Sequence, residues 1–215
     1  MWLYKEMVDI VFVLDESLSM NRYSQAYIKS INKFITTQKV FNPKGKFTMV
    51  KFNTEVKCLC LDREICSLPE FKKSDYYPNG VTTMYDAIGK AISLKVGQNV
   101  QNVIMFILTD GSDNNSKIFD KKQIADKIVD LKSFGWSFVY IATDKAAQKI
   151  GSELCIETCV TYKESDKSID YVADACNIAV GHAMHRWTGV NNQYSNKKVP
   201  TDVSELMNNF ASLSL

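Results

Sequence analysis

The chain has 215 residues, of which 46% are hydrophobic and 23% charged, and its formal net charge is +2. This length is enough for one α/β domain with a full core, and the composition is ordinary for a globular protein. The small net charge argues against nucleic acid or membrane partners, and no apolar run reaches the roughly 20 residues that span a bilayer. Because the first residues lack the pattern of a signal peptide, we expect a cytoplasmic protein.

The chain begins with a strand signal followed by a helix signal. Residues 8–14 are apolar and mostly β-branched apart from Asp9, which predicts a buried strand. Tyr27, Ile31 and Ile35 recur at helical spacing and predict an amphipathic helix. The turn-forming residues Asn42–Gly45 are expected to end it.

Two further strands follow this helix, over residues 47–52 and 56–61. The residues between them are too few for a crossover helix, so we predict an antiparallel hairpin. Residues 62–79 are polar and contain two prolines, which predicts a long surface loop.

Strand and helix signals alternate through the rest of the chain. Residues 103–108 are apolar on both faces, as in a central parallel strand, and Gly135 is a candidate for the end of a helix. The predicted elements are a helix over 83–94, a strand over 102–108, a helix around 124–131, a strand over 136–142, a short helix through 150–151, a strand over 155–162 and a long helix from about 169 to 185.

These elements predict a doubly wound, Rossmann-like α/β fold. The sheet should have six mostly parallel strands with one antiparallel edge hairpin, between two helical layers in a three-layer α/β/α sandwich. We assign this domain to residues 1–185. Residues 186–215 form a carboxyl-terminal tail with a polar linker and apolar residues over 203–213 that suit a short helix. This tail is either packed on the domain or a flexible appendage, and we expect the fold not to depend on it.

The cysteine spacing does not match a zinc knuckle. Cys58 and Cys60 are two apart in a predicted strand and should face the same side, as should Cys155 and Cys159. We therefore expect buried, free thiols, as in a reducing compartment, at Cys58, Cys60, Cys66, Cys155, Cys159 and Cys176.

Polar residues follow the first predicted strand directly. Asp15, Ser17 and Ser19 form a D-x-S-x-S frame at its carboxyl end, where open α/β sheets bind ligands. A carboxylate and two hydroxyls are oxygen ligands suited to Mg²⁺, Mn²⁺ or Ca²⁺. The alternative is an amino-terminal cap for the next helix.

Two other loops carry oxygen ligands. Asp110 follows the central strand in the run L-T-D-G, and Thr82 lies in a glycine-led loop that enters a helix. The first and central strands lie side by side in a doubly wound sheet, so Asp15 and Asp110 can meet at one edge. Asp113 and Asn114 lie close by in the sequence, and we interpret them as solvated loop residues.

Together these motifs resemble the von Willebrand factor A domain and its metal-ion-dependent adhesion site, over about residues 7–185. The resemblance rests on D-x-S-x-S, then G-x-T ahead of Y-D-A-I, then L-T-D-G, in that order. The loop has Val81 where the family usually has a second glycine, which leaves Thr83 as an alternative to the preferred Thr82. The ligands implied by the resemblance are the hydroxyls of Ser17, Ser19 and Thr82 and the carboxylates of Asp15 and Asp110.

The resemblance implies a protein-binding module that is not an enzyme. Two carboxylates leave a divalent cation, Mg²⁺ above all, incompletely neutralised, so an acidic residue of a protein partner can complete its ligand shell. Neither nucleic acid nor a membrane is an expected partner.

Two other functions are less consistent with the sequence. Phosphoryl transfer through Asp15 usually needs a second carboxylate two residues later, and that position is Ser17. A structural domain with an unused metal site is the other alternative. His182 and His185 lie one helical turn apart without an acidic or cysteine partner, so we interpret them as an ordinary helical pair.

Overall fold

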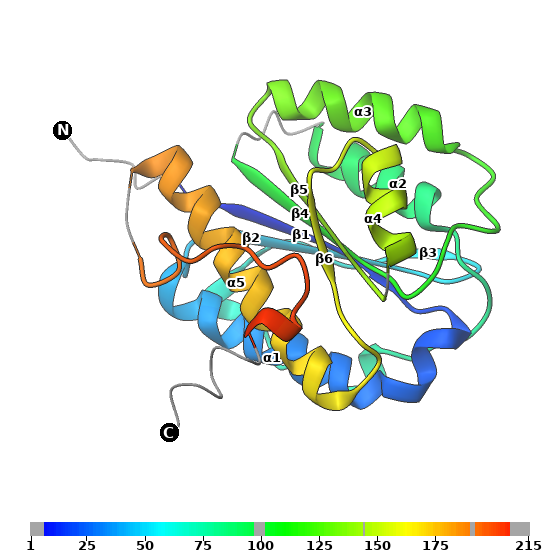
Figure 1. Cartoon of the computed structure of the whole chain (residues 1–215), viewed down its shortest axis with the longest axis horizontal. Helices are drawn as coiled ribbons and strands as arrows, with labels where there is room; N and C mark the ends of the chain where they lie inside the picture. The colour runs from blue at the N-terminus through cyan, green and yellow to red at the C-terminus, as the bar shows by residue number, and fades with distance from the viewer. Residues whose placement is uncertain (1–6, 97–101, 144, 190–191, 207–215) are drawn as a thin grey trace.

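A six-stranded sheet lies between two layers of helices in the computed structural model, which describes residues 7–96, 102–143, 145–189 and 192–206 (Figure 1). The strand order is β3-β2-β1-β4-β5-β6; β2 and β3 are antiparallel and the other neighbours are parallel. The predicted fold class is therefore confirmed. The strands are β1 (Asp9–Asp15), β2 (Lys46–Phe52), β3 (Val56–Glu64), β4 (Val103–Leu108), β5 (Ser137–Ala142) and β6 (Thr158–Thr161).

The helices divide the core into two parts, one on each face of the sheet. In Figure 1, α1 and α5 lie on one side and α2, α3 and α4 on the other. Within the described residues, none of these helices is long and apolar enough to cross a membrane. Their bounds are α1 Ser24–Phe41, α2 Met84–Val96, α3 Lys121–Ser133, α4 Lys145–Glu153 and α5 Asp166–Thr188.

Successive side chains of β1 point to opposite faces of the sheet, and both faces are buried, as expected for a strand in the middle of the sheet. Phe12 and Leu14 pack towards α1 and α5, whereas Val11 and Val13 pack towards the opposite layer. A strand buried on both faces needs apolar side chains on both, and β1 has them at every position from Ile10 to Leu14. Gly135 has φ +88° just after α3, a conformation that favours glycine, so the predicted helix end is confirmed.

Residues 65–79 form a mostly exposed loop after the end of β3 at Glu64, but this loop is not polar throughout as the sequence predicted. Ile65, Leu68, Phe71 and Tyr76 are all buried in the same core cluster as α1 and β2. The side chain of Asn32 on α1 bonds both the N–H and the carbonyl of Phe71, at 2.8 Å each. These apolar side chains follow neither helical nor strand spacing, so a periodicity argument missed them.

The tail packs on the domain over the part that the structure describes. Residues 192–206 run along α5 and past the end of β6, where Thr161 pairs with Asp202. Val203 is 0% exposed, and its N–H donates to the carbonyl of Thr161 at 2.9 Å. Of the two arrangements considered for the tail, the described part is therefore packed on the domain, and the independence of the fold from the tail stays a prediction. Of the predicted apolar helix over 203–213, residues 204–206 are helical and the rest lies outside the described residues.

The cysteines are free, but most are not buried. Cys58, Cys66 and Cys155 are exposed, Cys60 and Cys159 are partly buried, and Cys176 is buried. Cys58 pairs with Val50 and Cys60 with Met49, which face opposite sides of the sheet, because β3 has an irregularity between them. An extra residue in a strand reverses the side-chain alternation, so the predicted common face of this pair is wrong.

The second predicted cysteine pair also fails. The last strand begins at Thr158, so Cys155 precedes it in a turn, with φ +58°. Strand alternation therefore does not apply to Cys155 and Cys159.

Candidate metal site

Asp15 is the last residue of β1 and lies at the carboxyl edge of the sheet, beside the end of β4. Its side chain is 0% exposed. One carboxylate oxygen, Oδ1, accepts the N–H of Ser17 at 2.7 Å, and the other, Oδ2, accepts the hydroxyl of Thr109 at 2.6 Å. The hydroxyl of Tyr76 donates to the carbonyl of Asp15 at 2.7 Å. The carboxylate is therefore held in one orientation by its neighbours.

A chain of hydrogen bonds links Asp15 to the other predicted carboxylate. The hydroxyls of Ser17 and Ser19 lie 3.1 Å apart, and the Ser19 hydroxyl donates to Oδ1 of Asp110 at 2.8 Å. Asp110 follows β4, the parallel neighbour of β1. Four of the five candidate ligands are thus joined, from two adjacent strand ends.

Thr82 lies on the loop beside these four residues. The N–H of Leu18 donates to the carbonyl of Gly80 at 3.2 Å, which ties the Thr82 loop to the D-x-S-x-S turn. The hydroxyl of Thr83, the alternative ligand, donates to the carbonyl of Asn53 at 2.8 Å. The Thr83 hydroxyl therefore has a structural partner of its own.

Asp113 and Asn114 lie on a loop, Asn114 exposed and Asp113 partly buried, but their side chains also hold the backbone of the site. Asn114 accepts the N–H of Thr82 at 3.0 Å through its side-chain oxygen, and Asp113 accepts the N–H of Tyr85 at 3.2 Å. Asp86 accepts three backbone N–H groups of residues 117–119 at 2.8 to 2.9 Å. These side chains clamp the loop after β4 to the start of α2, and Asp and Asn are well suited to such bonds.

Three buried tyrosines lie beneath the site; the sequence analysis placed Tyr27 on the apolar face of a helix but assigned none of the three to the site. The hydroxyls of Tyr27 and Tyr162 are 2.9 Å apart, and the ring centroids of Tyr27 and Tyr76 are 6.4 Å apart. They come from α1, the end of β6 and the 62–79 segment. Their positions depend on tertiary packing, so no local motif reveals them.

Burial raises the pKa of both carboxyl groups. It raises the pKa of Asp15 from the ordinary 3.8 to about 6, although hydrogen bonds from Ser17 and Thr109 oppose the change. Burial likewise raises the pKa of Asp110, and the bond from Ser19 opposes it. Two poorly solvated carboxyl groups at one edge are a setting in which a bound cation is favourable.

The donor set suits a hard divalent cation. All five candidate donors are oxygens, three from hydroxyls and two from carboxylates, which is the chemistry that Mg²⁺, Mn²⁺ and Ca²⁺ prefer. In the described part of the chain, no group of three or more His, Cys, Asp or Glu side chains could hold a metal ion. Any metal at this edge therefore depends on the hydroxyl groups.

Comparison with solved structures reveals several similar chains. Proximal thread matrix protein 1 from the mussel byssus, with a zinc occupied MIDAS motif, matches 83% of this chain and 48% of its own length, at TM-score 0.56 and 15% identity. The vWF domain of the type V pili tip protein Mfa5 from Porphyromonas gingivalis matches 81% of this chain and 96% of its own length, at TM-score 0.60 and 12% identity. The PilB minor pilin from Streptococcus sanguinis matches 87% of this chain and 64% of its own length, at TM-score 0.64 and 13% identity.

These identities show a shared fold, and the chain spans about half the length of the mussel protein, 48%. None of the curated protein sequences that were compared matches it. The sequence profile of the von Willebrand factor type A domain, however, matches residues 9–168, which is most of the chain and includes β1, β4 and every candidate ligand. The chain belongs to the von Willebrand factor type A domain family.

Proposed function

We propose that the chain is a metal-dependent protein-binding module. The observation that carries the proposal is the hydrogen-bonded series from Asp15 through the two serines to Asp110, which gathers acidic and hydroxyl oxygens at one sheet edge. In this proposal a divalent cation is held by Asp15, Ser17, Ser19, Thr82 and Asp110. Mg²⁺ is the preferred ion, with Mn²⁺ and Ca²⁺ as alternatives.

A partner carboxylate would complete the ligand shell. The cation, when bound, supplies a positive charge that two protein carboxylates and neutral hydroxyls do not saturate. This chain orients the donors: the N–H of Ser17 and the hydroxyl of Thr109 hold Asp15, and Asn114 holds the backbone of Thr82. Such an arrangement suits binding to an acidic residue of another protein.

The similar structures support the proposal. The mussel byssus protein has a zinc occupied MIDAS motif, so the same fold holds a divalent metal there. Other similar structures are pilus proteins, including a pilus adhesin. We extend to this chain the general role of binding another protein, and we prefer Mg²⁺ to Zn²⁺ because its five donors are all oxygens.

We propose no catalytic activity for the module. Phosphoryl transfer through Asp15 usually needs a second carboxylate two residues later, but that position is Ser17, whose hydroxyl lies 3.1 Å from the Ser19 hydroxyl. His182 contacts the carbonyl of Lys197 on the tail, which gives it a structural role on α5. A cytoplasmic location also belongs to the proposal, because all six cysteines are free.

Thermal unfolding with and without divalent metal tests the metal site. At a hundredfold excess of Mg²⁺ over the dissociation constant, we expect the unfolding free energy to rise by about 2.7 kcal/mol. Asp15→Ala should abolish this rise, whereas the matched control Asp130→Ala, on the exposed face of α3, should keep it. An equal rise in wild type and Asp15→Ala would refute the site, and no rise in wild type would favour the unused-site alternative.

A further inference from the structure

Three large apolar side chains are exposed around the candidate metal ligands. Tyr77 is 76% exposed, Leu18 62% and Val81 40%. Leu18 lies between the two candidate serine ligands, and Val81 directly precedes the candidate threonine ligand. The N–H of Leu18 bonds the carbonyl of Gly80, so the two segments lie side by side. We call Leu18, Tyr77 and Val81 the apolar rim.

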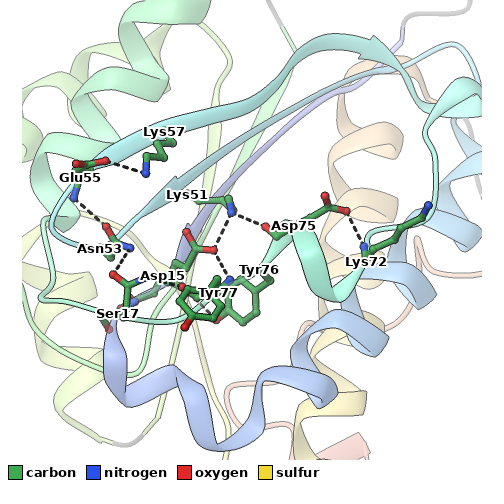
Figure 2. Close-up of polar contacts among 12 residues, drawn as sticks. Asp15, Ser17, Lys51, Asn53, Glu55, Lys57, Lys72, Asp75, Tyr76 and Tyr77 are labelled. Carbon is green, nitrogen blue, oxygen red and sulfur yellow. Dashed lines mark hydrogen bonds and ion pairs between the residues drawn. The ribbon is translucent and has the colours of Figure 1, made fainter.

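Tyr77 is held at the site by a buried ion pair. Glu16, between Asp15 and Ser17 in the chain, accepts the N–H of Tyr77 at 2.6 Å and the ammonium of Lys51 at 2.7 Å. Lys51 also donates to the carbonyl of Asp75, and Figure 2 shows this contact. The backbone carbonyl of Glu16 accepts the N–H of Asn79 at 2.9 Å. The segment from 75 to 79 is therefore anchored to the backbone of the metal-binding turn.

Anchoring and exposure together point to a contact surface. An exposed tyrosine on a fixed backbone has little conformational entropy to lose on binding, and tyrosine is enriched among the residues that dominate interface energies. Apolar side chains that surround a charged contact also exclude water from it, which strengthens the charged contact. The rim lies beside the turn and the loop that carry the candidate ligands, where the proposed partner ligand is a carboxylate.

We propose that the apolar rim selects the partner by the side chains next to its metal-bound carboxylate. The partner is a protein segment in which Asp or Glu is flanked by large apolar side chains, which pack on Tyr77, Leu18 and Val81. This inference rests on the proposed function, because the carboxylate position depends on the metal. It adds a sequence preference that the metal alone cannot impose, since a cation accepts any accessible carboxylate.

The test uses a display library of random linear peptides selected on the Mg²⁺-loaded chain, with elution by chelator. We expect enriched peptides with an acidic residue next to Leu, Ile, Phe, Tyr or Trp. Tyr77→Ala and Leu18→Ser should each weaken binding of the enriched peptides by about tenfold or more, as expected for an interface anchor. The matched control is Phe134→Ala, because Phe134 is 68% exposed at the end of α3, at the opposite edge of the sheet.

The outcomes separate this inference from the proposed function. The role of the apolar rim would be refuted if the enriched peptides had acidic residues without apolar neighbours. It would also be refuted if they bound both rim variants as tightly as wild type. Neither result would contradict the proposed metal-dependent binding. Failure to enrich any Mg²⁺-dependent peptide on a chain that shows the Mg²⁺ thermal shift also counts against it. Loss of the thermal shift itself in wild type would instead refute the metal site. Loss of binding in the Phe134→Ala control would show that the effect is not specific to the rim.

Discussion

Replacement of Asp15 by Asn is expected to stabilise the metal-free chain at neutral pH and to remove its response to metal. Asn has nearly the same shape as Asp, and its oxygen can still accept the N–H of Ser17. In the wild-type chain this N–H lies 2.7 Å from Oδ1 of Asp15. Its NH₂ group can donate to the hydroxyl of Thr109, which has a second acceptor in the carbonyl of Gly111 at 3.1 Å. The substitution therefore removes the buried charge and keeps the hydrogen bonds.

The pKa of Asp15 gives the size and pH dependence of this effect. Burial raises this pKa from 3.8 to about 6, so the folded chain disfavours the ionised form more than the unfolded chain does. The associated stability is fully present below pH 3.8 and is lost as pH rises through about 6. A difference of about two pH units, at about 1.4 kcal/mol each, amounts to about 3 kcal/mol. For a chain of this length, that corresponds to a melting temperature about 6 to 12 °C higher for Asp15→Asn at about pH 8.

Thermal unfolding in excess chelator, from about pH 4 to pH 8, measures this difference. The advantage of Asp15→Asn should be present at the alkaline end and shrink towards zero at the acidic end. Asp130→Asn, on the exposed face of α3, is the matched control and should follow wild type throughout. An Asp15→Asn variant that is no more stable than wild type at alkaline pH would refute the reasoning, as would an advantage that does not change with pH. Addition of Mg²⁺ should then stabilise wild type alone.

Four other substitutions test three separate parts of the structure. Tyr76→Phe removes the 2.7 Å bond to the carbonyl of Asp15 and should lower the unfolding free energy by about 1 kcal/mol in chemical denaturation; no change would show that this bond contributes nothing. Val203→Ser places a hydroxyl at a fully buried site and should cost about 2 kcal/mol, and a neutral effect would show that the tail is dispensable. Thr82→Ala should weaken Mg²⁺ affinity in calorimetric titration, whereas Thr83→Ala should lower stability and retain the affinity; the reverse pattern would exchange their roles.

Local signals in the sequence were enough to predict the sheet and most of the candidate site. Residues 10–14 of β1 and all residues of β4 are apolar, which is a strong indication of central parallel strands. Once these two strands are neighbours, the residues that follow them must meet at one edge, so Asp15 and Asp110 could be placed together. The polar residues around them were harder to interpret, because a loop Asp that accepts backbone N–H bonds looks the same in sequence as a solvated one.

The failed predictions concern features that depend on tertiary structure. An extra residue in β3 leaves no mark on the composition of the strand, yet it places Cys58 and Cys60 on opposite faces. The buried Phe71 and Val203 lie in polar surroundings in the sequence, and their burial depends on α1 and β6 being next to them. Periodicity cannot identify a side chain that packs on a distant element.

The loops of the site have anchors that do not involve the metal. Glu16 holds the backbone of residues 77 and 79, Asp86 holds residues 117–119, and Asn114 holds Thr82. Most of these anchors are carboxylate or amide oxygens that accept backbone N–H groups, so they persist whether or not a cation is bound. A site built in this way loses little conformational entropy when the cation arrives, so more of the intrinsic affinity of its oxygens is available for binding. For the same reason, removing the charge of Asp15 should leave the loops in place, and the stability gain and the loss of metal binding can be measured in the same folded chain.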